Sequence, residues 1–115
     1  MNLNILGVNK IINSGIEVEL ADTWRKRLVG LLAKQRIDDN YGLLFQPGES
    51  IHSIGMRFSI DVLFLDKSNK VLKITHEMKP FRLAFAPKGT CSVLEINSGN
   101  AKRTGIHLED TLEFV

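Results

Sequence analysis

The fold is decided by residues 60–75, which read IDVLFLDKSNKVLKIT. Residues 60–65 are the most apolar stretch of the chain and predict the central strand of a sheet. Residues 66–70 predict a hairpin loop, in which Asn69 is the residue suited to a positive φ angle. Residues 71–75 would then return as an antiparallel partner strand. This hairpin predicts a β-rich domain built around it.

Shorter strand patterns lie on the N-terminal and C-terminal sides of this hairpin. In residues 16–20, IEVEL, apolar and charged side chains alternate, which is typical of a strand with one buried face. Ser14 and Gly15 before it predict a turn, with residues 3–8 as the partner strand. Further short strands are expected at residues 42–45, 81–85, 92–96 and 111–115, and a single helical turn at residues 101–104.

One amphipathic helix is expected to begin at Asp22 or Thr23, because either side chain can accept a hydrogen bond from the first helical turn. Four apolar side chains then repeat at helical spacing: Trp24, Leu28, Leu31 and Leu32. The predicted fold is therefore mainly β (α+β by count). It is a strongly curved, mostly antiparallel sheet or a small, partly open barrel, with one amphipathic N-terminal helix.

The length of 115 residues and the ordinary composition predict a single domain over residues 1–115 with one hydrophobic core. Fifteen basic and 13 acidic side chains leave a net charge of +2, far less than a dedicated nucleic-acid binder usually concentrates on one face. A nucleic-acid partner is therefore a less favoured alternative. It would use the basic side chains Arg25, Lys26, Arg27, Lys34 and Arg36.

Cysteine content and hydropathy give an expectation about the cellular compartment. Cys91 is the one cysteine, so the chain can form no internal disulfide. Residues 1–7 lack the basic and apolar pattern of a signal peptide, and no apolar run approaches the roughly 18 residues of a membrane span. We therefore expect a cytoplasmic protein.

The motifs that carry well-known chemistry are missing from the sequence. It contains no phosphate-binding glycine loop, paired-histidine metalloprotease motif, C-x-x-C pair or glycine-flanked serine elbow. The three histidines, His52, His76 and His107, are far apart in the chain and have no recognisable ligand spacing. No metal site, cofactor or catalytic residue is predicted.

One segment, IHSIGMRFSID at residues 51–61, brings His52, Arg57 and Asp61 close together in the sequence. A charge at the start of a buried strand is costly unless it is paired, so Asp61 is expected to meet a cation or several backbone N–H groups. Arg57 is the local candidate, since its fork can bind a carboxylate through two hydrogen bonds. The segment is either a structural polar cluster that fixes strand register, or the rim of a cleft in which Arg57 and His52 bind a ligand.

Several blocks of the sequence resemble, in order, the prokaryotic family called domain of unknown function 192. The first blocks are Thr23 with Arg27, GLL at 30–32, GLLF at 42–45 and HSIGMRFSIDVLFLD at 52–66. The later ones are Pro80, VLEI at 93–96 with Gly99, and Gly105-Ile106 with Asp110. The resemblance implies a compact, mostly β domain with one helix and implies no defined activity. Relatives often carry glycine where this chain has Glu109.

We expect a non-catalytic binding module for a small polar or anionic ligand or a peptide, held in a cleft along residues 52–61. The candidate ligand-binding residues are His52, Met56, Arg57, Asp61, Trp24 and Phe58. One alternative is a small enzyme in which His52 is a general base, Asp61 orients it and Arg57 stabilises an anion. Another is a protein–protein adaptor whose terminal strand pairs with a partner's sheet edge.

Overall fold

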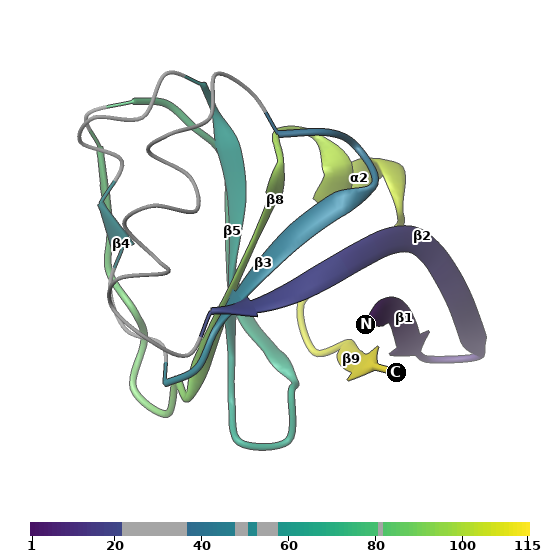
Figure 1. Ribbon diagram of the computed structural model, residues 1–115. Helices are drawn as coiled ribbons and strands as arrows, with labels where there is room; N and C mark the ends of the chain where they lie inside the picture. Colours follow the sequence, from purple (N-terminus) through teal and green to yellow (C-terminus); the bar gives the residue numbers. More distant parts are fainter. Residues whose placement is uncertain (22–36, 48–50, 53–57, 81) are drawn as a thin grey trace.

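The computed structural model describes residues 1–21, 37–47, 51–52, 58–80 and 82–115. This part of the chain is mainly β, as predicted, and Figure 1 shows its arrangement. The elements are β1 (Asn2–Gly7), β2 (Lys10–Ala21), β3 (Tyr41–Phe45), β4 (Ile51–His52), β5 (Ile60–Leu65), β6 (Val71–Met78), β7 (Leu83–Ala84), β8 (Ser92–Asn97), α2 (Asn100–Arg103) and β9 (Thr111–Phe114).

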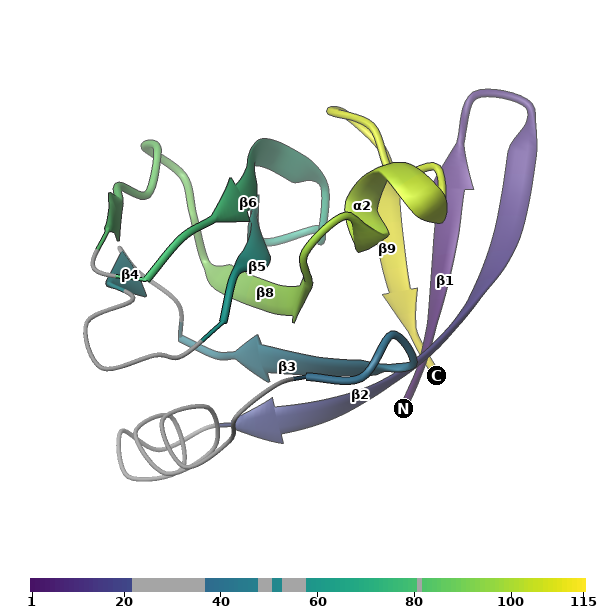
Figure 2. The same cartoon turned by 90° about the horizontal axis from the view of Figure 1, so that it is seen from above.

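Seven of the described strands form one sheet in the order β6-β5-β8-β3-β2-β1-β9, and β4 pairs with β7 in a small second sheet. Among the described strand pairs only β2 with β3 is parallel, which confirms the prediction of a mostly antiparallel sheet. The large sheet curves strongly, so that β1 and β9 stand across from β5 and β6, with α2 between them (Figure 2).

The curved sheet is open, although its two edge strands approach each other at one end. An isolated bridge joins Lys70 to Thr111, and the backbone N–H of Val71 donates to the carbonyl of Asp110 at 2.8 Å. These contacts bring the start of β6 next to the segment between α2 and β9. This approach of two distant parts of the sequence creates the candidate site described below.

Side chains of β3, β5 and β8 alternate between two hydrophobic cores, one on each face of the sheet. Leu63 and Leu94 point into the first core, which also receives residues of β1, β2, β9 and α2. Val62 and Val93 point into the second core, to which β7 contributes Ala84. Because the sheet has a core on each face here, all six residues of β5 are buried.

The decisive hairpin is formed by β5 and β6, as predicted, and Asn69 in its loop has a φ of 62°. The carboxylate of Asp66 accepts hydrogen bonds from the backbone N–H of Ser68 at 2.8 Å and of Lys70 at 2.9 Å.

The expectation that residues 60–65 form the central strand is wrong in detail. β5 lies between β6 and β8, and β3 holds the middle of the strand order.

The turn expected at Ser14 and Gly15 is wrong, because β2 runs straight through these residues. They form an irregularity at which the register with β1 shifts, and Gly15 has a φ of 74°. The Ser14 hydroxyl donates to the carbonyl of Leu3 at 2.6 Å and accepts from the N–H of Ile16 at 3.1 Å. A glycine with positive φ serves a β-bulge as well as a turn, so the local signal was misassigned.

The described residues contain one helix, α2, which confirms the helical turn expected at residues 101–104. The amphipathic helix expected from Asp22 or Thr23, and its basic side chains, lie outside the described residues and stay a prediction. No helix in the described part of the chain is long and apolar enough to cross a membrane.

Candidate functional site

The buried carboxylate of Asp61 is held by two backbone N–H groups from different elements. Its Oδ1 accepts from the N–H of Glu77 at 2.8 Å, and its Oδ2 accepts from the N–H of Ala101 at 2.9 Å. Asp61 is fully buried, so these charge-assisted hydrogen bonds replace the water that the carboxylate lost on folding. Of the two partners expected for Asp61, a cation or several backbone N–H groups, the N–H groups are confirmed.

Both of these bonds have consequences for local geometry. Glu77 has a φ of 51° at an irregularity in the pairing of β6 with β5, next to His76. Such bulges re-aim the side chains beside them. Ala101 belongs to the first turn of α2 and precedes Lys102. Asp61 therefore ties the end of β6 to α2 and fixes the positions from which His76 and Lys102 project.

The other residues predicted for the ligand site lie apart from this carboxylate or outside the described part of the chain. The backbone of His52 belongs to β4, opposite Leu83 of β7, on the side of the second core. Phe58 is half-buried against the same core. Asp61 bonds to Ala101, which belongs to the first core, so its carboxylate lies on the other face of the sheet. The side chains of His52, Trp24, Met56 and Arg57 lie outside the described residues.

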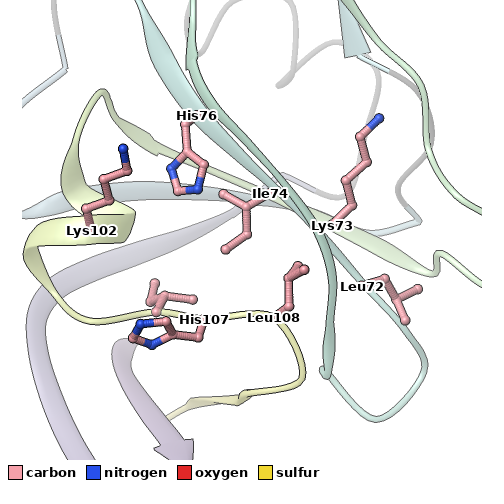
Figure 3. A pocket seen from close by; sticks show the side chains of 8 residues that line it. Leu72, Lys73, Ile74, His76, Lys102, His107 and Leu108 are labelled. Atoms are coloured by element: carbon pink, nitrogen blue, oxygen red, sulfur yellow. The ribbon is translucent and has the colours of Figure 1, made fainter.

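A pocket of about 490 Å³ lies where β6 faces α2 and the segment after it (Figure 3). We call it the β6–α2 groove. Its lining residues are Leu72, Lys73, Ile74, His76, Lys102, Ile106, His107 and Leu108. Aliphatic side chains make up half of this lining, and nitrogen-bearing side chains make up the other half. The groove combines apolar contact with hydrogen-bond donors, as small-molecule sites in proteins do.

The three polar side chains that surround the groove come from three different segments. His76 projects from β6, Lys102 from α2, and His107 from the connection between α2 and β9, and Figure 3 shows all three around Ile74. All three side chains are exposed, and within the described part of the chain no carboxylate forms an ion pair with Lys102 or His76.

The fourth nitrogen-bearing side chain of the lining, Lys73, directs its ammonium group away from the groove (Figure 3). Its Nζ donates to the carbonyl of Phe85 at 3.0 Å and lies 5.5 Å from the centre of the Phe64 ring. Only the aliphatic part of Lys73 therefore serves the groove.

His107 is held in place by a small polar cluster with Lys10 and Asp110. The Lys10 ammonium lies 2.8 Å from Asp110 Oδ2, 2.7 Å from the Gly105 carbonyl and 3.1 Å from His107 Nδ1. The backbone N–H of His107 donates to the same Asp110 carboxylate at 2.8 Å. A charge on β2 thus fixes the segment that carries His107 and Leu108.

The described histidines do not form a metal site. Within the described residues, no group of three histidine, cysteine, aspartate or glutamate side chains could hold a metal ion. His76 and His107 share one groove nonetheless, although 31 positions separate them in the sequence. Sequence reasoning missed this pair because only the approach of β6 to the segment before β9 brings them together.

Comparison with known proteins supports the resemblance seen in the sequence. The model of the DUF192 family, described as an uncharacterized ACR, matches residues 7–114. A UPF0127 protein of Pyrococcus furiosus is 29% identical over 116 residues, which cover 96% of this chain and 97% of that protein. A UPF0127 protein of Thermococcus sibiricus is 41% identical over 78 residues, 63% of this chain and 48% of that protein.

Solved structures show the same fold. A crystal structure of a protein of unknown function from Novosphingobium aromaticivorans has a TM-score of 0.85 and 25% identity, covering 99% of this chain and 84% of that one. A crystal structure from Sinorhizobium meliloti also has a TM-score of 0.85, at 24% identity, covering 97% of this chain and 91% of that one. Since the family model spans almost the whole sequence, the chain belongs to the DUF192 family.

Proposed function

We propose that this protein is a non-catalytic binding module for a small anionic ligand, which it holds in the β6–α2 groove. The observation that carries the proposal is the convergence of Lys102, His76 and His107 around the apolar side chains of Ile74 and Ile106. An ammonium group and two imidazoles can all donate hydrogen bonds to an anion, and the aliphatic side chains provide a surface that excludes water.

The volume of the groove and the hydrogen bonds that hold its walls favour a binding role. A pocket of about 490 Å³ falls within the roughly 300–1,000 Å³ typical of small-molecule sites. Two walls of the groove are tied together through the buried carboxylate of Asp61, which bonds to Glu77 and Ala101. A site whose walls are held by buried hydrogen bonds loses little conformational freedom when a ligand binds.

A catalytic role has less support from the described residues. The enzyme alternative required Asp61 to orient His52, but both oxygens of Asp61 accept backbone hydrogen bonds on the opposite face of the sheet from β4. Ligand binding by Arg57 and His52, as inferred from the sequence, stays a second candidate location for the same function.

An NMR titration of the ¹⁵N-labelled protein tests the proposal and separates the two locations. The probes are inorganic phosphate, citrate and hexanoate, added to the wild type and to the variants Lys102→Met and Arg57→Ala. We expect at least one probe to shift the amide signals of residues 74–76 and 102–108 in a saturable way. Loss of the charged contact in Lys102→Met should weaken that binding about tenfold or more.

Lys67→Met is the matched control, because it removes the same charge from the β5–β6 hairpin loop, outside the groove. Its affinity should equal that of the wild type. If no probe moves the groove signals, the proposed function is wrong at this location. A titration that responds to Arg57→Ala and not to Lys102→Met would assign binding to the segment at residues 52–61.

A further inference from the structure

We infer that the ligand of the β6–α2 groove is a monoanion with an apolar body, namely a carboxylate that carries an aliphatic or aromatic group. The inference rests on the proposed anion-binding function and adds the chemical class of the ligand. It follows from the number of uncompensated positive charges around the groove and from the nature of its walls.

The Lys10 ammonium contributes no free charge, because Asp110 neutralises it at 2.8 Å. An ammonium group has three donors and no acceptor. Lys10 places these donors against Asp110 Oδ2, the Gly105 carbonyl and His107 Nδ1. His107 Nδ1 lies 3.1 Å from both the Lys10 ammonium and the Gly105 carbonyl, so this nitrogen is engaged within the cluster and Nε2 is the ring nitrogen left for a ligand.

Two further cationic side chains near Lys102 and Ile74 are bonded to other groups. The Lys73 ammonium is directed to the carbonyl of Phe85 and the ring of Phe64, away from the groove. Arg103, next to Lys102, donates to the Asn100 side chain and to the Asp39 carbonyl. Among the groups that line the groove, Lys102 thus supplies the ammonium, while the imidazoles of His76 and His107 supply hydrogen-bond donors. One ammonium group with imidazole N–H donors complements a carboxylate.

A phosphate ester fits this arrangement less well. Phosphate sites in proteins typically use an arginine fork, a helix N-terminus or a glycine-rich loop to meet nearly two negative charges. The eight residues that line the groove include no arginine and no glycine. Of the two lysines in this lining, Lys73 is bonded to the Phe85 carbonyl, so a dianion would have the single ammonium of Lys102 to meet its two charges.

The aliphatic side chains of the groove indicate that the ligand also carries an apolar group. Ile106 is buried at 3% exposure and Leu108 beside it is 57% exposed, so the apolar surface extends from the floor of the groove to its rim. An alkyl or aryl group on the ligand would cover Leu108 and Ile74 and remove both from water. Burial of each added methylene should strengthen binding by up to about fourfold until the chain outgrows the groove.

The test is a calorimetric and NMR comparison of butyrate, hexanoate, hexanol, hexyl phosphate and inorganic phosphate at pH 7.5. We expect hexanoate to bind more tightly than butyrate by up to about fifteenfold, because it has two more methylenes. Hexanoate should also bind more tightly than hexanol, hexyl phosphate and inorganic phosphate, with shifts at residues 74–76 and 102–108.

Two variants separate the two halves of the ligand. Leu108→Ser, at an exposed position, should reduce the advantage of hexanoate over butyrate, because one of the apolar contacts is lost. Lys102→Met should abolish the advantage of hexanoate over hexanol, and Lys67→Met should leave both advantages unchanged. Tighter binding of either phosphate in the groove, or equal binding of butyrate and hexanoate, overturns the ligand class while the anion-binding function stands. Absence of groove binding by every anion overturns both.

Discussion

At the scale of single residues, Asp61 is a fully buried carboxylate held by two backbone N–H groups. We expect Asp61→Asn to lower the free energy of unfolding by about 3 kcal/mol, because the amide nitrogen would face a backbone N–H that the carboxylate now satisfies. Urea-induced unfolding measures this loss. The same variant should weaken anion binding in the β6–α2 groove, since Asp61 ties Glu77 to Ala101.

Glu113→Gln is a suitable control for that experiment. Glu113 is an exposed carboxylate that accepts from the Asn4 side chain at 3.0 Å, and its replacement should change stability by no more than about 0.5 kcal/mol. If Asp61→Asn were as mild as this control, Asp61 would have no structural role and its buried bonds would contribute nothing.

A second prediction at this scale concerns Glu109, which has a φ of 74°. A side chain in this region costs about 1–2 kcal/mol, and glycine largely avoids that cost. Glu109 also lies 3.5 Å from Lys70, an exposed ion pair of small value. Glu109→Gly should therefore be more stable than Glu109→Ala by about 1 kcal/mol, measured as a difference in thermal unfolding. The reverse order would show that the loop relaxes out of this conformation.

At the scale of elements, the β5–β6 hairpin depends on the ionised form of Asp66. The backbone hydrogen bond from Lys70, and further that from Ser68, lowers the pKa of Asp66 below its usual value of 3.8. A group whose pKa is lowered on folding stabilises the protein above its unfolded pKa, and this contribution is lost as the pH falls through the folded pKa.

Asp66→Asn should accordingly destabilise the protein at pH 7, and its difference from the wild type should shrink as the pH falls well below about 4. Chemical unfolding of both proteins across this range measures the effect. A difference that stayed constant at low pH would mean that the shape of the side chain, and not its charge, supports the hairpin loop.

At the scale of the whole molecule, β8 contributes to both hydrophobic cores through adjacent residues. Leu94 is fully buried in the first core and Val93 in the second. Because both belong to β8, truncation of either side chain should destabilise the same strand. Leu94→Ala should cost about 2–5 kcal/mol and Val93→Ala somewhat less. In both variants, unfolding should remain one cooperative transition.

Hydrogen exchange checks the cooperativity at residue level. Protection in β1 and β9, on one side of the curved sheet, should fall together with protection in β5 and β6 on the other. If Leu94→Ala released β1, β2 and β9 while β5 and β6 kept their protection, the two cores would be independent units.

Much of the fold could be predicted from local patterns, because hairpin loops and the alternation of buried and exposed side chains depend on residues close together in the sequence. The β5–β6 hairpin, the positive φ of Asn69, the strand at residues 92–97 and the helical turn at residues 100–103 are examples. The need of Asp61 for buried partners also followed from its position at the start of an apolar strand. A glycine signal, in contrast, fits a turn or a bulge equally well, and for this reason Gly15 was misassigned.

The order of the strands and the composition of the groove depend on contacts between residues far apart in the sequence. β1 pairs with β9, and a bridge joins Lys70 to Thr111. The two ends of the chain therefore lie beside each other and next to the start of β6. These contacts bring His107 to His76 and leave Asp61 facing α2 rather than β4. No local pattern records which strand will lie beside which, because that choice depends on how two cores can be filled at once on the two faces of one curved sheet.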